Sequence, residues 1–106
     1  MIYLNPEWRL IPGWPEYDVS EDGQVRRALG GKGARAGRLL KPWRNPRNQY
    51  LYVQLWRGNH RKAVPVHRLV AMAFLGRPPS ERHVVAHDDG TRDVNHPWNL
   101  RWATQR

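Results

Sequence analysis

The residues best suited to chemistry lie near the end of the chain. His87 ends the short apolar run VVAH, an Asp-Asp-Gly turn follows it, and Asn99 opens the next apolar run twelve residues after the histidine. Two such runs joined by turn residues predict a hairpin that brings the imidazole and the amide close together. Near pH 7 a neutral imidazole can take a proton from water, and an amide can hold the loop that carries it. From the spacing alone, the simpler interpretation is that His87 and Asn99 are ordinary polar residues on the surface.

Asp88 and Asp89 are the candidate metal ligands beside this histidine. The chain has no cysteine, so only His, carboxylate and amide groups are available to bind a metal. Carboxylates that precede a glycine in a tight turn usually accept hydrogen bonds from their own backbone, and this structural role is the competing interpretation for both. His67 is expected to have a structural or capping role at the start of a helix.

The elements that must position these residues are predicted from hydrophobic periodicity. The run HRLVAMAFL, residues 67–75, has one apolar stripe and is followed by Gly76 and two prolines, so it predicts a short amphipathic helix. Residues 83–87 and 99–104 predict the two strands of the hairpin. A helix this short is stable only when it packs against a sheet.

The N-terminal part of the chain predicts short antiparallel strands. Residues 17–20 and 24–27 flank an Asp-Gly turn, which is a strong signal for a hairpin. Residues 50–56 alternate aromatic and aliphatic side chains, and the run 61–66 contains Pro65, which places it at an edge or an end of a sheet. Among the other aromatic residues, we expect Trp8, Trp14, Trp98 and Trp102 to pack and His96 to face solvent.

An excess of positive charge makes nucleic acid the expected partner. The 18 Lys and Arg residues outnumber the 9 Asp and Glu residues, which gives a net charge of +9. A guanidinium group can grip a phosphate in two places, and the Gly-rich basic run at residues 30–38 predicts a mobile loop, either a plain linker or one that orders on phosphate. The candidate DNA contacts are Arg26, Arg27, Lys32, Arg35, Arg38, Arg44, Arg47, Arg57, Arg61 and Lys62.

Membrane and extracellular classes are disfavoured by the same sequence. No apolar run approaches the ~20 residues that a spanning helix needs. The chain has neither a secretory leader pattern at its start nor cysteines for a disulfide framework. We therefore expect a cytoplasmic protein.

Four segments, in order along the chain, resemble a known family. VHRLVAMAF at 66–74, VVAHDDG at 84–90 and NLRWATQ at 99–105 resemble the HNH (His-Me finger) endonucleases, in particular their phage and intron-homing branch. EWRLIPGWPEYDVSEDGQVR at 7–26 resembles the nuclease-associated DNA-binding motif that precedes such domains. The resemblance covers nearly the whole chain and implies a protein encoded by a phage or mobile element in a bacterial host.

The resemblance implies an α+β fold and a nuclease. It implies a small antiparallel sheet with one covering helix, followed by a ββα-metal hairpin whose final helix is short or missing. Residues 1–106 are expected to form a single domain, with a basic β region at 1–65 and an HNH core at 66–106. By this resemblance His87 is the general base, Asn99 holds its loop, and the substrate is double-stranded DNA. It also implies one divalent cation, Mg²⁺ first, with Mn²⁺, Ni²⁺ and Zn²⁺ as alternatives.

Two positions depart from the family pattern. Ala86 stands where the family often has a metal-binding Asp, Asn or His, and the place of the last metal ligand falls after Arg106. The sequence is then a piece of a longer nuclease, or the cation is held by Asp88 or Asp89 with phosphate and water, or the protein binds DNA without cutting it. A protein that works beside another chain, or as a homodimer, is a further alternative.

Overall fold

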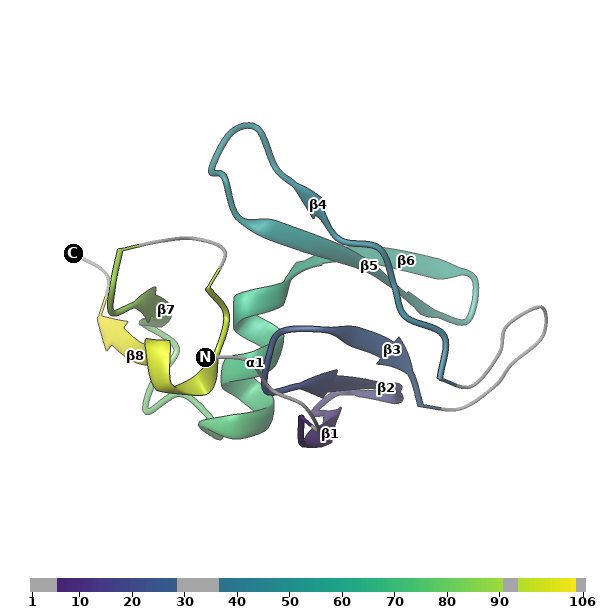
Figure 1. Ribbon diagram of the computed structural model, residues 1–106, viewed down its shortest axis with the longest axis horizontal. Helices are drawn as coiled ribbons and strands as arrows, with labels where there is room; N and C mark the ends of the chain where they lie inside the picture. Colours follow the sequence, from purple (N-terminus) through teal and green to yellow (C-terminus); the bar gives the residue numbers. More distant parts are fainter. Residues whose placement is uncertain (1–5, 29–36, 91–93, 105–106) are drawn as a thin grey trace.

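One helix lies between a two-stranded hairpin and two three-stranded antiparallel sheets (Figure 1). The computed structural model describes residues 6–28, 37–90 and 94–104. The α+β class predicted from the sequence, with antiparallel strands and a covering helix, is confirmed. Most of the basic run at residues 30–38 lies outside the described residues.

The first sheet is formed by the N-terminal strands. β1 (Trp8–Ile11), β2 (Trp14–Ser20) and β3 (Val25–Arg27) are antiparallel, in the order β1-β2-β3. The predicted β2–β3 hairpin is confirmed, with Val19 paired to Val25 and both side chains buried. The segment before it forms β1, which pairs with β2 as a third strand.

The second sheet contains the strand that the sequence predicted most clearly. β4 (Trp43–Arg44), β5 (Leu51–Arg57) and β6 (His60–Pro65) are antiparallel, in the order β4-β5-β6. The aliphatic face of β5 points inward as predicted, since Val53 and Leu55 are buried. Pro65 ends the edge strand β6, where its missing N–H breaks no ladder.

The helix α1 (Val66–Phe74) follows β6 without a loop and begins and ends one residue earlier than predicted. Its buried residues are Val66, His67, Leu69, Val70 and Ala71. The apolar ones among these side chains join one hydrophobic core that includes residues of all three sheets. None of the helices in the described part of the chain has the length and apolar character to cross a membrane.

The C-terminal hairpin packs on the other side of α1 (Figure 1). β7 (His83–His87) and β8 (Leu100–Thr104) are antiparallel, and the 3-10 helix η1 (Pro97–Asn99) precedes β8 in the connecting segment. Both predicted strands are confirmed. The final helix expected after them would lie beyond residue 104, outside the described residues.

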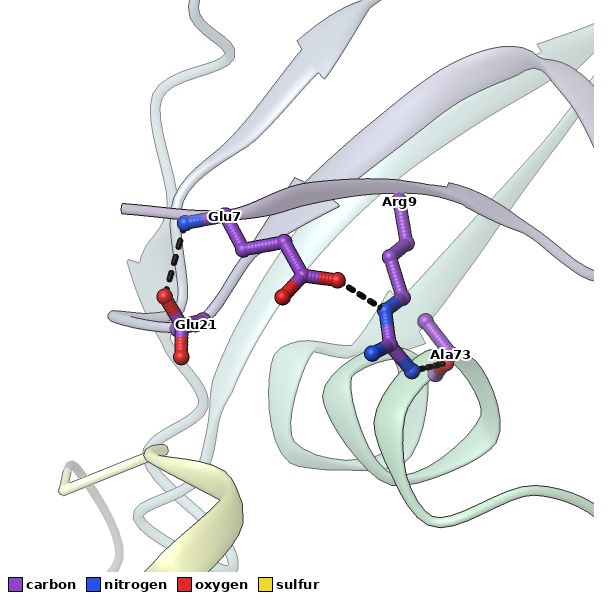
Figure 2. Close-up of polar contacts among 4 residues, drawn as sticks. All are labelled: Glu7, Arg9, Glu21 and Ala73. Atoms are coloured by element: carbon purple, nitrogen blue, oxygen red, sulfur yellow. Dashed lines mark hydrogen bonds and ion pairs between the residues drawn. The ribbon is translucent and has the colours of Figure 1, made fainter. Parts of the chain in front are cut away.

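Polar contacts tie β1 to the end of the helix. Figure 2 shows Arg9 reaching the last turn of α1, where its Nη1 donates to the carbonyl oxygen of Ala73 at 3.3 Å. Its Nε lies 2.5 Å from Oε2 of Glu7, whose own N–H donates to Oε1 of Glu21 after β2. The guanidinium also lies over the Phe74 ring, 4.6 Å from its centre. A cation is favoured at the carboxyl end of a helix, so these contacts fix β1 on α1.

One buried hydroxyl joins the first sheet to the second. Tyr17 of β2 is 1% exposed, and its hydroxyl oxygen accepts hydrogen bonds from the backbone N–H of Trp56 at 2.9 Å and from Nη1 of Arg27 at 3.1 Å. The Trp56 bond crosses from β2 to β5, which belong to different sheets. The relative placement of the two sheets therefore depends in part on this oxygen atom.

Replacing this hydroxyl should destabilise the protein without unfolding it. We expect Tyr17→Phe to lower the free energy of unfolding by about 1–3 kcal/mol, because the Trp56 N–H and the Arg27 guanidinium lose an acceptor. Urea denaturation with an unchanged m value would measure it. The matched control is Tyr52→Phe, which removes a half-buried hydroxyl that accepts only from the side chain of Asn48, and should cost less. Equal losses in the two variants would contradict the linking role.

Candidate active site

His87 is the last residue of β7 and lies where the hairpin opens into its loop. It pairs with Leu100 of β8, and its carbonyl oxygen accepts a hydrogen bond from the N–H of Gly90 at 3.1 Å, which closes the Asp-Asp-Gly turn. The side chain is half-buried. The imidazole is thus fixed through its backbone and keeps part of its surface open to solvent.

Asn95 contacts one edge of this imidazole. The Nε2 atom of His87 lies 2.7 Å from Oδ1 of Asn95, a residue that is 4% exposed. Sequence reasoning missed Asn95, because it lies in the loop between the strands, where amides are common and no periodicity marks them. The sequence feature that could have identified Asn95 is its position in the segment between the two predicted strands, because this segment must fold back over the turn after His87.

Two aromatic rings surround the same imidazole. The ring centre of His67 lies 5.3 Å from that of His87, and the ring of Tyr50 lies 4.4 Å from His67 and 6.0 Å from His87. His67 does not cap the helix as one expectation had it, because Pro65 takes the N-cap position. Tyr50, assigned only to a sheet face by the sequence, immediately precedes β5 and is part of the site because the start of β5 lies beside the start of α1.

His67 is held in its neutral form. Burial first, and then the positive charges that His87 and Arg68 can carry, together lower the pKa of His67 from 6.5 to about 4. Its Nδ1 is buried and has no hydrogen-bond partner among the described residues. At neutral pH His67 is therefore an uncharged ring beside His87.

Asn99 joins the turn after His87 to the loop that follows it. It is 2% exposed, its Nδ2 donates to Oδ1 of Asp89 at 3.0 Å and to the carbonyl oxygen of Val94 at 2.8 Å, and its Oδ1 accepts from the N–H of Asp89 at 3.2 Å. Its backbone carbonyl accepts from the N–H of Asp88 at 2.8 Å. This position is compatible with the loop-holding role implied by the resemblance, which stays a prediction.

The two candidate metal ligands are engaged within the protein. Oδ1 of Asp88 lies 2.8 Å from Nε of Arg101, and Oδ1 of Asp89 accepts from Asn99. Ala86, the residue before His87, presents only a methyl group. Across residues 6–28, 37–90 and 94–104, no three His, Asp or Glu side chains gather as a metal site. The described residues therefore do not fit a divalent cation as a complete ligand set.

Two of the candidate DNA contacts are engaged in the first sheet. Nη2 of Arg26 lies 3.0 Å from Oδ2 of Asp18, and its guanidinium lies 3.8 Å from the ring centre of Trp8. Nη2 of Arg27 lies 3.6 Å from Oε2 of Glu16. These contacts explain much of the conformation of both side chains without DNA.

The other described candidates lie exposed, and they come from the second sheet and the segments around it. Lys32 and Arg35 lie outside the described residues. The exposed candidates are Arg38, Arg44, Arg47, Arg57, Arg61 and Lys62.

A groove of about 770 Å³ lies between the two three-stranded sheets and combines cations with aromatic rings. Its lining includes Arg27, Arg38, Lys41, Trp43 and Trp56. The two tryptophans are 40% and 44% exposed, so the aromatic face of β5 is partly accessible to solvent. Stacking rings among cations are typical of nucleic-acid contacts. His87 is not part of this lining.

The loop before β8 corrects one expectation about packing. Trp98 was expected to pack in the interior, and it is 53% exposed because η1 turns it outward. Its ring stacks on that of His96 at 5.4 Å, and His96 is half-buried rather than solvent-facing. The pair exposes an aromatic surface in the loop that also carries Asn95.

The comparison with known families agrees with the resemblance noted in the sequence and with the fold. Residues 64–106 match the family model described as HNH endonuclease, and residues 7–56 match the NUMOD4 motif. The chain thus contains an HNH endonuclease domain with a NUMOD4 motif ahead of it. HNH endonucleases generally use a divalent metal.

Individual relatives are viral. The chain is 38% identical over 101 residues to DNA endonuclease I-HmuI of Bacillus phage SP01, covering 94% of this chain and 53% of that protein. It is 33% identical over 100 residues to an uncharacterized HNH endonuclease of Acanthamoeba polyphaga mimivirus, covering 94% of this chain and 28% of that protein. The chain thus spans about half of the first relative and less of the second.

A solved structure shares the fold. The structure described as DNA binding and cleavage by the HNH homing endonuclease I-HmuI matches with a TM-score of 0.76 and 39% identity. The match covers 92% of this chain and 52% of that chain.

The buried histidine predicts a specific dependence of stability on pH. The pKa of His67 is about 4 in the folded protein and has its ordinary value of 6.5 in an unfolded chain, so between these values the unfolded state binds the extra proton. The free energy of unfolding should therefore fall as pH drops from about 6.5 to about 4, by up to about 3 kcal/mol from His67. His67→Gln should remove this part of the slope in urea denaturation, whereas the exposed control His60→Gln should keep it. The same slope in wild type and His67→Gln would contradict this account.

Proposed function

We propose that this chain is a DNA endonuclease that hydrolyses phosphodiester bonds of double-stranded DNA, by nicking or cutting, with His87 as general base. The observation that carries the proposal is the imidazole itself. It lies half-buried at the end of β7, held by Asn95 and by two aromatic rings, in a chain 38% identical to a phage DNA endonuclease.

The reaction follows from the position of this base. His87 takes a proton from a water molecule, and the resulting hydroxide oxygen attacks the phosphorus in line with the leaving 3′ oxygen. A new P–O bond forms as the bond to the 3′ oxygen breaks, and the leaving oxygen takes up a proton. Asn99 keeps the loop in place during this step through its bonds to Asp89 and Val94.

We propose one divalent cation as the cofactor, with Mg²⁺ as the first candidate. The family generally uses such an ion, which would stabilise negative charge on the phosphate. Because the described residues do not form a complete ligand set, Asp88 or Asp89 would contribute only alongside phosphate and water oxygens. Mn²⁺, Ni²⁺ and Zn²⁺ are the alternatives to compare.

We also propose that residues 1–106 work as one domain, with the basic region at 1–65 placing the HNH part at 66–106 on DNA. The shared hydrophobic core and the groove of cations and tryptophans support this division of labour. The similarity to a Bacillus phage protein supports a phage-encoded protein that works in the bacterial cytoplasm.

Loss of the base should abolish cleavage while leaving binding intact. We expect His87→Ala to lower the rate of cleavage of supercoiled plasmid by about 10²–10⁴-fold with Mg²⁺ or Mn²⁺ present, and chelation to stop the wild-type reaction. The control is His83→Ala, at the other end of the same strand, where the imidazole contacts Ser80. Equal cleavage by wild type and His87→Ala would remove His87 from the mechanism.

A catalytically incomplete DNA-binding module is the second candidate. Ala86 and the internal contacts of Asp88 and Asp89 favour it. In that case wild type and His87→Ala would both shift plasmid mobility and leave it supercoiled. Cleavage gained by Ala86→Asp in an otherwise inactive protein would show that a lost ligand is the cause.

The exposed cations should make DNA binding strongly dependent on salt. Each phosphate neutralised contributes ~0.9 to the slope of log affinity against log salt concentration. We expect Arg61→Ala with Lys62→Ala to reduce the slope by up to ~2. Arg26→Gln should leave the slope unchanged, because Arg26 is paired with Asp18. A slope near zero in the wild type would remove the arginines from the binding mechanism.

A further inference from the structure

We propose that Asn95 is the positioning residue for His87, and that the turn between β2 and β3 in turn holds Asn95 in place. The inference rests on the proposed role of His87 as general base, and it identifies what selects the reacting nitrogen of that base. It also gives the N-terminal hairpin a role in the site, in addition to DNA contact.

The hydrogen bond to Asn95 decides which nitrogen of His87 is free. In a neutral imidazole one nitrogen carries the hydrogen and the other accepts. The amide oxygen Oδ1 can only accept, so the Nε2 atom that lies 2.7 Å away carries the hydrogen. The lone pair is then on Nδ1. In the proposed reaction Nδ1 is therefore the atom that takes the proton from water.

The surroundings of Asn95 make this bond durable. Asn95 is 4% exposed, so water competes little for its oxygen atom. Tyr50 and His67 pack on His87 with ring centres at 6.0 and 5.3 Å, which hinders rotation of the imidazole away from the amide. The orientation of the base is thus set by three contacts from three segments of the chain.

The turn after β2 supports Asn95 from the N-terminal half. A Cβ atom built on Gly23 would lie 3.2 Å from Cβ of Asn95 and 3.5 Å from its carbonyl oxygen. Gly23 also has φ +82, a conformation that favours glycine. Its N–H donates to the carbonyl oxygen of Ser20 at 3.0 Å, and Oγ of Ser20 accepts from the N–H of Gln24 at 3.0 Å. The backbone of Gly23, which has no side chain, therefore packs directly on Asn95, the residue that contacts His87.

The tautomer of His87 can be measured without reference to activity. Long-range ¹H–¹⁵N correlation spectra of the ¹⁵N-labelled chain, recorded at slightly alkaline pH, distinguish protonated from unprotonated ring nitrogens. We expect wild-type His87 to carry its hydrogen on Nε2. Asn95→Leu should abolish this preference, and Asn95→Asp, which keeps an acceptor, should restore it. Hydrogen on Nδ1 in the wild type, or an unchanged tautomer in Asn95→Leu, would overturn the proposal.

Cleavage should follow the tautomer. We expect Asn95→Leu to slow plasmid cleavage by at least about 10-fold and Asn95→Asp to recover most of the rate, because a misdirected base loses its alignment with the attacking water. A rate unaffected by Asn95→Leu would overturn the positioning role. The wild-type spectrum needs no variant, so it can still contradict the proposal if Asn95→Leu fails to fold.

The supporting turn has a matched control in the same sheet. Gly23→Ala and Gly13→Ala place a side chain at nearly the same backbone angle, φ +82 and +83, but the added Cβ atom meets Asn95 only at position 23. Both variants should lose stability through the same backbone strain, and Gly23→Ala should lose more because of its contact with Asn95. Only Gly23→Ala should shift the ring signals of His87. Equal effects on these signals would overturn the support by the turn.

The failure of this inference is distinguishable from failure of the proposed function. Wild-type protein that shows hydrogen on Nε2, loses it in Asn95→Leu and cleaves no DNA under any tested metal would support the positioning of the ring. The same result would overturn His87 as a working general base.

Discussion

The burial of α1 is the constraint on which the rest of the structure depends, because this one short helix is the common partner of strands from all three sheets. A helix of nine residues has little stability of its own in water. It persists because Val66, Leu69 and Val70 are almost completely removed from solvent by strands on both sides. The same packing brings the start of β5, the start of α1 and the end of β7 together. The cluster of Tyr50, His67 and His87 is therefore a product of the core.

Much of the fold could be predicted from the sequence because short-range patterns determine it. The β2–β3 turn, the alternation in β5 and the apolar stripe of 67–75 are each local patterns, and each element is confirmed, the helix with its bounds one residue earlier. The strand end that carries His87 is local in the same sense. Local patterns do not say how strands group, so the division of the N-terminal strands into two sheets, linked by the hydroxyl of Tyr17, was not foreseen.

The site could be predicted only in part, because its remaining members come from distant segments. Asn95 is an amide in a loop, and nothing in its neighbours distinguishes it until the loop is folded over His87. His67 looked like a helix-start residue, and only the tertiary fold shows that it is buried beside another imidazole. For the cations, the residues themselves are obvious in the sequence. The contacts that they make within the protein are not. Arg26 and Arg57 lie over the rings of Trp8 and Trp14, at 3.8 and 4.3 Å.

These arginine contacts suggest how a small core is supplemented at its edges. A guanidinium group over an indole covers apolar surface and keeps its charge, so it can complete the packing of an edge strand without a second sheet layer. Net charge alone therefore overstates the number of cations available to DNA, because some of them also serve the fold.

The close fit of Gly23 against Asn95 has a consequence for how this two-part architecture can change. The NUMOD4 region and the HNH region have separate family models, yet in this chain Gly23 of the first region packs against Asn95 of the second. If another N-terminal module were fused to the HNH region, it would need a glycine at the same place in its turn. A donor module with a side chain at the position of Gly23 would bring that side chain against Asn95.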